Sequence, residues 1–110
     1  MIDRFDKSAV GGLFFILDEQ HQPIQVDFRT WAVWFEDFNN RRVAEDKVGA
    51  LRVSTVFLGI THMGGIFETM VFDGKQDLDQ WRYETWADAL AGHARVVEEL
   101  KQKEKTRGSK

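Results

Sequence analysis

Three residues of this chain carry side chains that could together transfer protons or bind a metal ion: His62, Glu68 and His93. His62 lies in a glycine-bearing loop, Glu68 in a predicted strand and His93 in a predicted helix. Brought together, they would form an acid–base pair or a metal site. Their spacing matches no metal motif, and neither histidine has a second ligand close by in the sequence. We therefore expect no metal site and no catalytic residue, with His93 bonded to a backbone carbonyl or to Glu68.

The other polar side chains of the apolar segments also favour structural roles. Ser54 and Thr55 lie inside a predicted strand, without the adjacent base and exposed turn that a nucleophile needs. We expect a hydroxyl pair with Thr69 on the neighbouring strand. An isolated buried carboxylate is costly, so we expect Glu68 to pair with an arginine, either Arg52 or Arg82.

Length and composition bound the class of protein. The chain has 110 residues, which favours one domain, here residues 1–100, followed by a flexible basic tail over residues 101–110. The net charge of −3 argues against a nucleic-acid-binding protein. There is no cysteine, no signal-peptide pattern and no apolar run of membrane-spanning length, which favours a cytoplasmic protein without membrane contact. No motif predicts a cofactor.

The hydrophobic pattern predicts an α+β fold. Runs at 13–17 and 24–26 predict a hairpin, and Pro23 predicts that its second strand is an edge strand. Further strands are expected at 41–48, 51–60, 66–72 and 81–83, with a turn at Asp73 and Gly74. Two helices are expected, the first over residues 28–38 and the second from Trp86 onward. The predicted order is roughly ββαβββα, a mostly antiparallel sheet of about five strands with both helices on one face.

Each helix has a recognisable start and an apolar stripe. Asp27 is a good N-cap for the first helix, because its carboxylate can accept from the free amides of the first turn. Thr85 begins a capping box for the second. The stripe of the second helix is predicted to comprise Trp86, Leu90, Ala94, Val97 and Leu100.

The first helix is unusually rich in aromatic residues. Trp31, Trp34, Phe35 and Phe38 recur at helical spacing. One interpretation places them all in the core; the other gives some of them to an interface, with a protein partner or in a homodimer. For the second interpretation we take Trp31, Trp34, Phe38 and His62 as the candidate partner-binding residues.

Most of the segment from residue 23 to residue 93 resembles a group of small uncharacterised proteins encoded by bacteriophages, prophages and some bacterial genomes. The resemblance implies a mobile-element origin and brings no activity, cofactor or site residue with it. It rests on Pro23-Ile24, Trp31, Phe35-Glu36, the run 41–44 (RRVA), the run 53–60 (VSTVFLGI), the run 67–72 (FETMVF), the run 82–86 (RYETW), and Ala89, Ala91, Gly92 and His93.

Together these features favour a non-catalytic, phage-like accessory protein that binds a host or phage protein. Inhibition of a host defence or regulatory complex by steric occlusion is one form of this hypothesis. The alternative is a small metal-dependent or acid–base enzyme that uses His62, Glu68 and His93. A structural protein of a virion also fits the sequence. A nucleic-acid-binding module would require steep salt-dependent binding.

Overall fold

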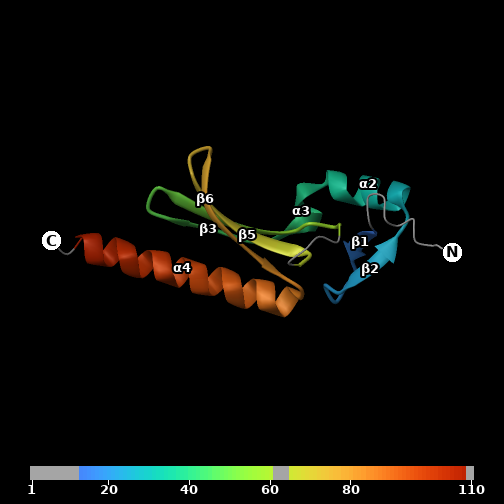
Figure 1. Ribbon diagram of the computed structural model, residues 1–110. Coiled ribbons are helices and arrows are strands. Elements are labelled where there is room, and N and C mark those ends of the chain that lie inside the picture. Colours follow the sequence, from blue (N-terminus) through green and yellow to red (C-terminus); the bar gives the residue numbers. More distant parts are fainter. Residues whose placement is uncertain (1–12, 61–64, 109–110) are drawn as a thin grey trace.

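A computed structural model describes residues 13–60 and 65–108 of the chain, and in them the predicted α+β class is confirmed (Figure 1). The described part contains two antiparallel sheets, one of two strands and one of four, and three helices. The elements in order are β1 (Phe14–Leu17), β2 (Pro23–Val26), α2 (Phe28–Glu36), α3 (Phe38–Arg41), β3 (Arg42–Val48), β4 (Leu51–Phe57), β5 (Phe67–Asp73), β6 (Gln76–Tyr83) and α4 (Trp86–Gly108).

The predicted N-terminal hairpin is formed by β1 and β2. Its turn is held by Asp18, whose carboxylate accepts from the amides of Gln20 at 2.8 Å and Gln22 at 2.9 Å. His21 adopts the left-handed conformation in this turn (φ 65°), and its ring stacks on Trp86 with 3.9 Å between centroids. The hairpin turn is thereby attached to the first turn of α4.

The hairpin also joins the end of β4. The amide of Phe15 donates to the carbonyl of Gly59 at 2.8 Å, so β1 is bonded on both sides. β2 is therefore the outer strand, as Pro23 predicts. At Gly59 (φ 78°) a β-carbon would overlap the indole of Trp31, so the backbone can approach this ring only because the side chain is absent.

The predicted aromatic helix is divided into α2 and α3. Asp27 is its N-cap as predicted, and its carboxylate accepts from the amide of Thr30 at 2.8 Å. Asp37 then leaves the helical conformation (ψ 108°) and caps α3 by accepting from the amide of Asn39 at 2.9 Å. An aspartate side chain that bonds to nearby amides competes with a continuous helix, and here it starts a new one.

The four-stranded sheet is a meander in the order β3-β4-β5-β6. Its last strand is longer than the sequence predicts, because β6 begins at Gln76, directly after the Gly74 turn (φ 64°), rather than at Trp81. The first five residues of β6 are exposed and mostly polar, so they lack the apolar alternation that marks a strand. They pair with β5 through the backbone at the sheet edge.

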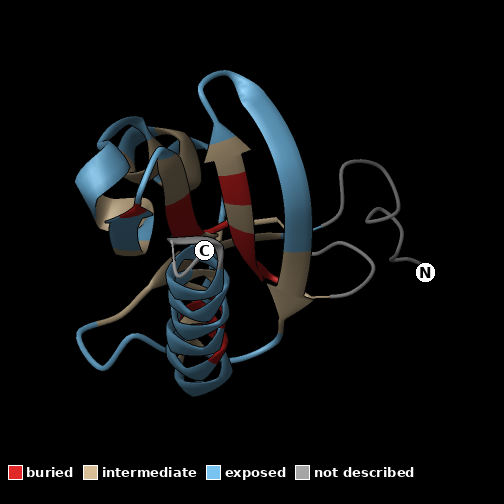
Figure 2. Ribbon diagram, turned by 90° about the vertical axis from the view of Figure 1, so that its left-hand side faces the viewer, coloured by how far each residue is buried: buried red, intermediate tan, exposed pale blue. Residues whose placement is uncertain are grey.

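Helix α4 lies along one face of this sheet and buries Ala89, His93 and Val96 against it (Figure 2). The predicted stripe is wrong at Leu90, which is 43% exposed, and at Ala94, which is also exposed. The small residues at 89 and 92 take the buried positions instead, because they let the helix approach the sheet closely.

The helix continues to Gly108, where the sequence favoured a flexible tail from residue 101. Its last turns are rich in helix-forming residues, and Gln102 donates to Glu98 one turn earlier at 2.9 Å. The Glu104 carboxylate occupies the space that a β-carbon on Gly49 would need, so the helix reaches the turn between β3 and β4. The exposure expected for this segment holds over residues 101–106.

The core between α4 and the sheet consists of two clusters. One is centred on Phe57, Ile66, Phe67 and Ala89 and receives the hairpin and Trp34. The other contains Val53, Val71 and Val96. The prediction that both helices cover one face is wrong, because α2 and α3 lie on the other side of the sheet from α4, at one end of it (Figure 1). Most of that second face carries no helix among the described residues.

Replacing Gly92 by alanine tests the close contact between α4 and β6. Inside a helix this change normally stabilises by about 1 kcal/mol. Here the new methyl group would overlap the ring of Tyr83, so we expect a loss of about 1–3 kcal/mol, measured by denaturant unfolding. In a Tyr83→Leu background the same change should be neutral or stabilising. A gain in both backgrounds would contradict the contact.

The cap of α2 gives a pH-dependent prediction. Hydrogen bonds from the amide and then the side chain of Thr30 hold the pKa of the Asp27 carboxyl below its ordinary value. The stabilisation is therefore complete above the unfolded-state pKa and is lost as the pH falls through the folded-state pKa. Asp27→Asn keeps the cap without the charge, so its free energy of unfolding should approach that of the wild type at acidic pH. A difference that does not change with pH would contradict this.

Candidate functional site

The structure separates Glu68 from His93. Glu68 accepts from Nε of Arg82 at 3.2 Å, which confirms the predicted arginine pair. Its neighbour Thr69 bonds to Thr55, which in turn bonds to His93. Successive strand residues point to opposite faces, so Glu68 and His93 lie on opposite sides of the sheet. His62, the third member of the proposed group, lies outside the described residues.

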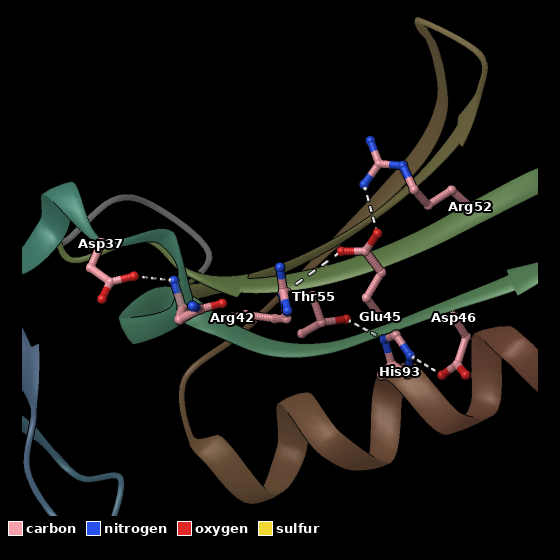
Figure 3. A network of polar contacts seen from close by, with 8 residues as sticks. Asp37, Arg42, Glu45, Asp46, Arg52, Thr55 and His93 are labelled. Carbon is pink, nitrogen blue, oxygen red and sulfur yellow. Dashed lines mark hydrogen bonds and ion pairs between the residues drawn. The ribbon is translucent and has the colours of Figure 1, made fainter.

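His93 is the centre of a chain of hydrogen bonds that we call the histidine chain: Asp46, His93, Thr55 and Thr69. Its Asp46 end is exposed, whereas His93, Thr55 and Thr69 are buried; Figure 3 shows Asp46, His93 and Thr55. Nδ1 of His93 lies 2.7 Å from the Thr55 hydroxyl oxygen and its Nε2 lies 2.8 Å from the Asp46 carboxylate. The prediction of a backbone carbonyl or Glu68 as its partner is therefore wrong, whereas the Thr55–Thr69 hydroxyl pair is confirmed. A neutral His93 that donates to Asp46 can accept from Thr55, so both ring nitrogens are satisfied.

The histidine chain has the order carboxylate, imidazole, hydroxyl that is used in nucleophilic catalysis. Such chemistry requires a substrate to reach the hydroxyl, and Thr55 and Thr69 are both fully buried. Thr55 also lies in the middle of a central strand rather than on an exposed turn. In this arrangement the chain joins α4 to β3, β4 and β5. Among the described residues, no three His, Cys, Asp or Glu side chains gather as metal ligands would.

Of the candidate partner-binding aromatic residues, two pack inside the fold and one is exposed at the surface. Trp31 stacks on Phe35 at 4.6 Å, and Trp34 meets Phe57 edge to face at 5.7 Å, so both tryptophans contribute to packing. Phe38 is 37% exposed. The break at Asp37 turns Phe38 onto the sheet face opposite α4, which we call the open face.

Strand pairing places three rows of side chains across the open face. The rows follow from the registers of the three strand pairs and the alternation of side chains. They are Arg42, Val56, Glu68 and Arg82; then Glu45, Ser54, Met70 and Gln80; then Lys47, Arg52, Phe72 and Asp77. The two inner columns hold the apolar members and the outer columns are charged or polar.

An apolar groove of about 230 Å³ lies on the open face, between Phe38 and the inner columns. β4 and β5 also carry Val56, Met70 and Phe72 on this face, so burial of their other face against α4 leaves these three apolar side chains facing outward. The groove is lined by Phe38, Arg52, Ser54, Val56, Met70 and Phe72.

Arginines lie along the side of this groove that is formed by α3, β3 and β4. Arg41 lies over the rings of Phe35 and Phe38, with 4.1 Å and 4.9 Å from its Cζ to the two centroids. Arg52 lies over Phe72 at 4.5 Å. A third arginine, Arg42, lies on β3. The carboxylate of Glu45 lies between Arg42 and Arg52, 3.9 Å from Nε of Arg42 and 3.6 Å from Nη1 of Arg52 (Figure 3). These ion pairs are partly exposed, so each contributes only about 0–1 kcal/mol to stability.

Two other hollows have charged or polar residues in their walls. One, of about 640 Å³, lies where β6 meets α4 and has basic and acidic side chains in its wall, among them Arg95 and Asp88. The other, of about 240 Å³, lies between the hairpin turn and α3, beside Trp34, His21 and Asn39. Because charges of both signs or mixed polar groups line them, neither favours one class of ligand.

Comparisons of the chain with protein-family models, with curated proteins and with solved structures gave no match. None of the helices in the part of the chain that the structure describes is long and apolar enough to cross a membrane.

Sequence reasoning identified Phe38 but missed the other groove residues, Val56, Met70 and Phe72. A signal for them exists, because the segments 51–60 and 66–72 are apolar at both odd and even positions. That pattern is typical of a strand buried on both faces. The alternative, one face in the core and one available to a partner, has the same pattern.

The histidine chain predicts an ordered set of stabilities. Thr55→Val removes the central hydroxyl and leaves two buried groups, Nδ1 of His93 and the hydroxyl of Thr69, each without a partner at a cost of about 1–3 kcal/mol. Thr69→Val leaves the bond between Thr55 and His93 in place and should cost less. Thr55→Ser, which keeps the hydroxyl, serves as the control. Equal stability of the two valine variants in urea unfolding would contradict a continuous chain.

Proposed function

We propose that the protein acts by binding another protein and catalyses no reaction. The observation that carries this proposal is the apolar groove on the open face, next to Phe38. Val56, Met70 and Phe72 are half-buried on this face, and a contiguous apolar patch with a polar rim is typical of an interaction site. The exposed ring of Phe38 lies at the edge of this groove, where it can pack against a partner.

The side chains with catalytic potential support the same proposal. His93 is 4% exposed and uses both ring nitrogens inside the fold. Glu68 is 8% exposed and bonded to Arg82. A general base or nucleophile must be reachable by a substrate, and these groups are engaged with their neighbours.

The setting that we propose is the cytoplasm of a bacterial cell, with a host or phage protein as the partner. This follows the resemblance of the chain to phage- and prophage-encoded proteins. A protein of this size can inhibit a host defence or regulatory complex by occupying a surface that the complex needs. Such an inhibitor requires only a small group of well-packed anchors and no cofactor.

Phe38→Ala tests the proposed surface. The partner is first identified by cross-linking and affinity capture from host or infected-cell lysate, then purified and titrated calorimetrically against the wild type. Loss of a central anchor should cost about 2 kcal/mol, or roughly 30-fold in Kd. Val33→Ala, at a 68% exposed position on α2, is the matched control and should change Kd less than about twofold.

A second variant separates loss of binding from loss of folding. Phe72→Thr truncates the other ring of the groove and keeps a residue that favours strands. Thermal unfolding should show both variants to be folded. A partner that binds the wild type, Phe38→Ala and Phe72→Thr with equal affinity would contradict the groove as the binding surface, and no specific partner at all would contradict the proposed function.

A further inference from the structure

The groove has the volume of an anchor pocket rather than of a ligand cavity. Its volume of about 230 Å³ is below the roughly 300–1,000 Å³ of pockets that enclose small molecules. Its apolar wall includes Val56, Met70 and Phe72, and a methionine adapts its shape to an inserted group. One large apolar side chain of a partner is the occupant that this size and lining favour.

The rim of the groove is basic on the side of α3, β3 and β4, although the chain as a whole is acidic. Arg41, Arg42, Lys47 and Arg52 lie there, and the carboxylate of Glu45 lies between Arg42 and Arg52. On the β6 side, Gln80 and Asp77 are opposite Met70 and Phe72. The net charge of the chain is −3, so these cations are a local concentration.

One feature of the rim is unfavourable to the isolated protein. Lys47 and Arg52 are directly opposite each other in the β3–β4 register, and like charges in that position repel. Carboxylates of a partner would relieve the repulsion, and they pair well with the forked donors of arginine.

The arrangement of the rings in the groove favours a protein segment over a nucleic acid as the ligand. Proteins that bind single strands offer bare aromatic faces on which bases stack. Here a guanidinium lies over Phe72, and two lie over Phe38. A partner side chain in the groove and partner carboxylates at the rim can bind without displacing these guanidinium groups, whereas a stacked base would have to displace them.

From this complementarity we infer that the partner presents an acidic segment with a single large apolar anchor, aromatic or aliphatic. This inference rests on the proposed function. The anchor fills the groove, and carboxylates next to the anchor meet the basic side of the rim, formed by α3, β3 and β4.

A yeast-displayed library of random peptides, selected against the full chain, tests the partner chemistry directly. Enriched peptides should combine several Asp or Glu residues with one large apolar residue. A synthetic copy of the strongest peptide should bind more weakly as salt rises. Peptides without acidic residues, or binding that salt does not change, would overturn the acidic segment but would leave the proposed function to the Phe38→Ala experiment.

Lys47→Glu separates a binding role from a structural one. It should lower affinity for the acidic peptide at least about tenfold, because it places a carboxylate where one is to be bound. The melting temperature should stay the same or rise, because the new carboxylate would lie opposite Arg52. Lys101→Glu, with the same charge change on an exposed turn of α4, should leave affinity within about twofold.

Two results would assign the open face to another occupant and overturn the inference. The first is tight binding of a fluorescent oligothymidylate that Lys47→Glu abolishes, which would indicate a nucleic acid. The second is a dimer in analytical ultracentrifugation that Phe38→Ala disrupts, which would indicate a second copy of this chain.

Discussion

One buried histidine fixes how the long helix lies on the sheet. An apolar helix face can slide or rotate on an apolar sheet at small cost, because the hydrophobic effect is not directional. His93 removes that freedom, since its two nitrogens find partners at only one position, between Thr55 on β4 and Asp46 on β3. Any other register would leave buried polar groups without partners. The packing of Tyr83 over Gly92 follows from the same register.

The placement of α4 determines what the other face of the sheet can do. The helix has 23 residues, or about 35 Å at 1.5 Å per residue, long enough to follow the sheet along its strands. It packs against the side chains on one face of β4 and β5, which are every second residue of each strand. The alternate residues then face away from it, and within residues 13–60 and 65–108 they are covered at one end, by Phe38. An antiparallel sheet that needs one covered face usually has polar residues on the other. Val56, Met70 and Phe72 depart from that rule.

Much of the fold could be predicted from local signals, and most of the site could not. The hairpin, the Asp27 cap and the apolar strands have short-range patterns, and all are found where expected. The partners of His93 lie 38 and 47 residues away, so no local pattern could identify them. The aromatic helix shows the same limit. Its spacing places Trp34 and Phe38 on one stripe, yet after the break at Asp37 the ring of Trp34 packs on the core residue Phe57, whereas Phe38 lines the groove on the open face.

The arginines on the open face explain how the unbound protein can carry an apolar groove without aggregating. A bare apolar groove would favour aggregation, and guanidinium groups over Phe38 and Phe72 reduce the exposed ring area. Each cation–π contact contributes only about 0.5–1 kcal/mol at an exposed site, so a partner can replace it at small cost. The repulsion between Lys47 and Arg52 also favours binding, because it raises the free energy of the unbound protein and a partner's carboxylate would reduce it. A surface of this kind is specific because a partner must supply the missing negative charge as well as the apolar anchor.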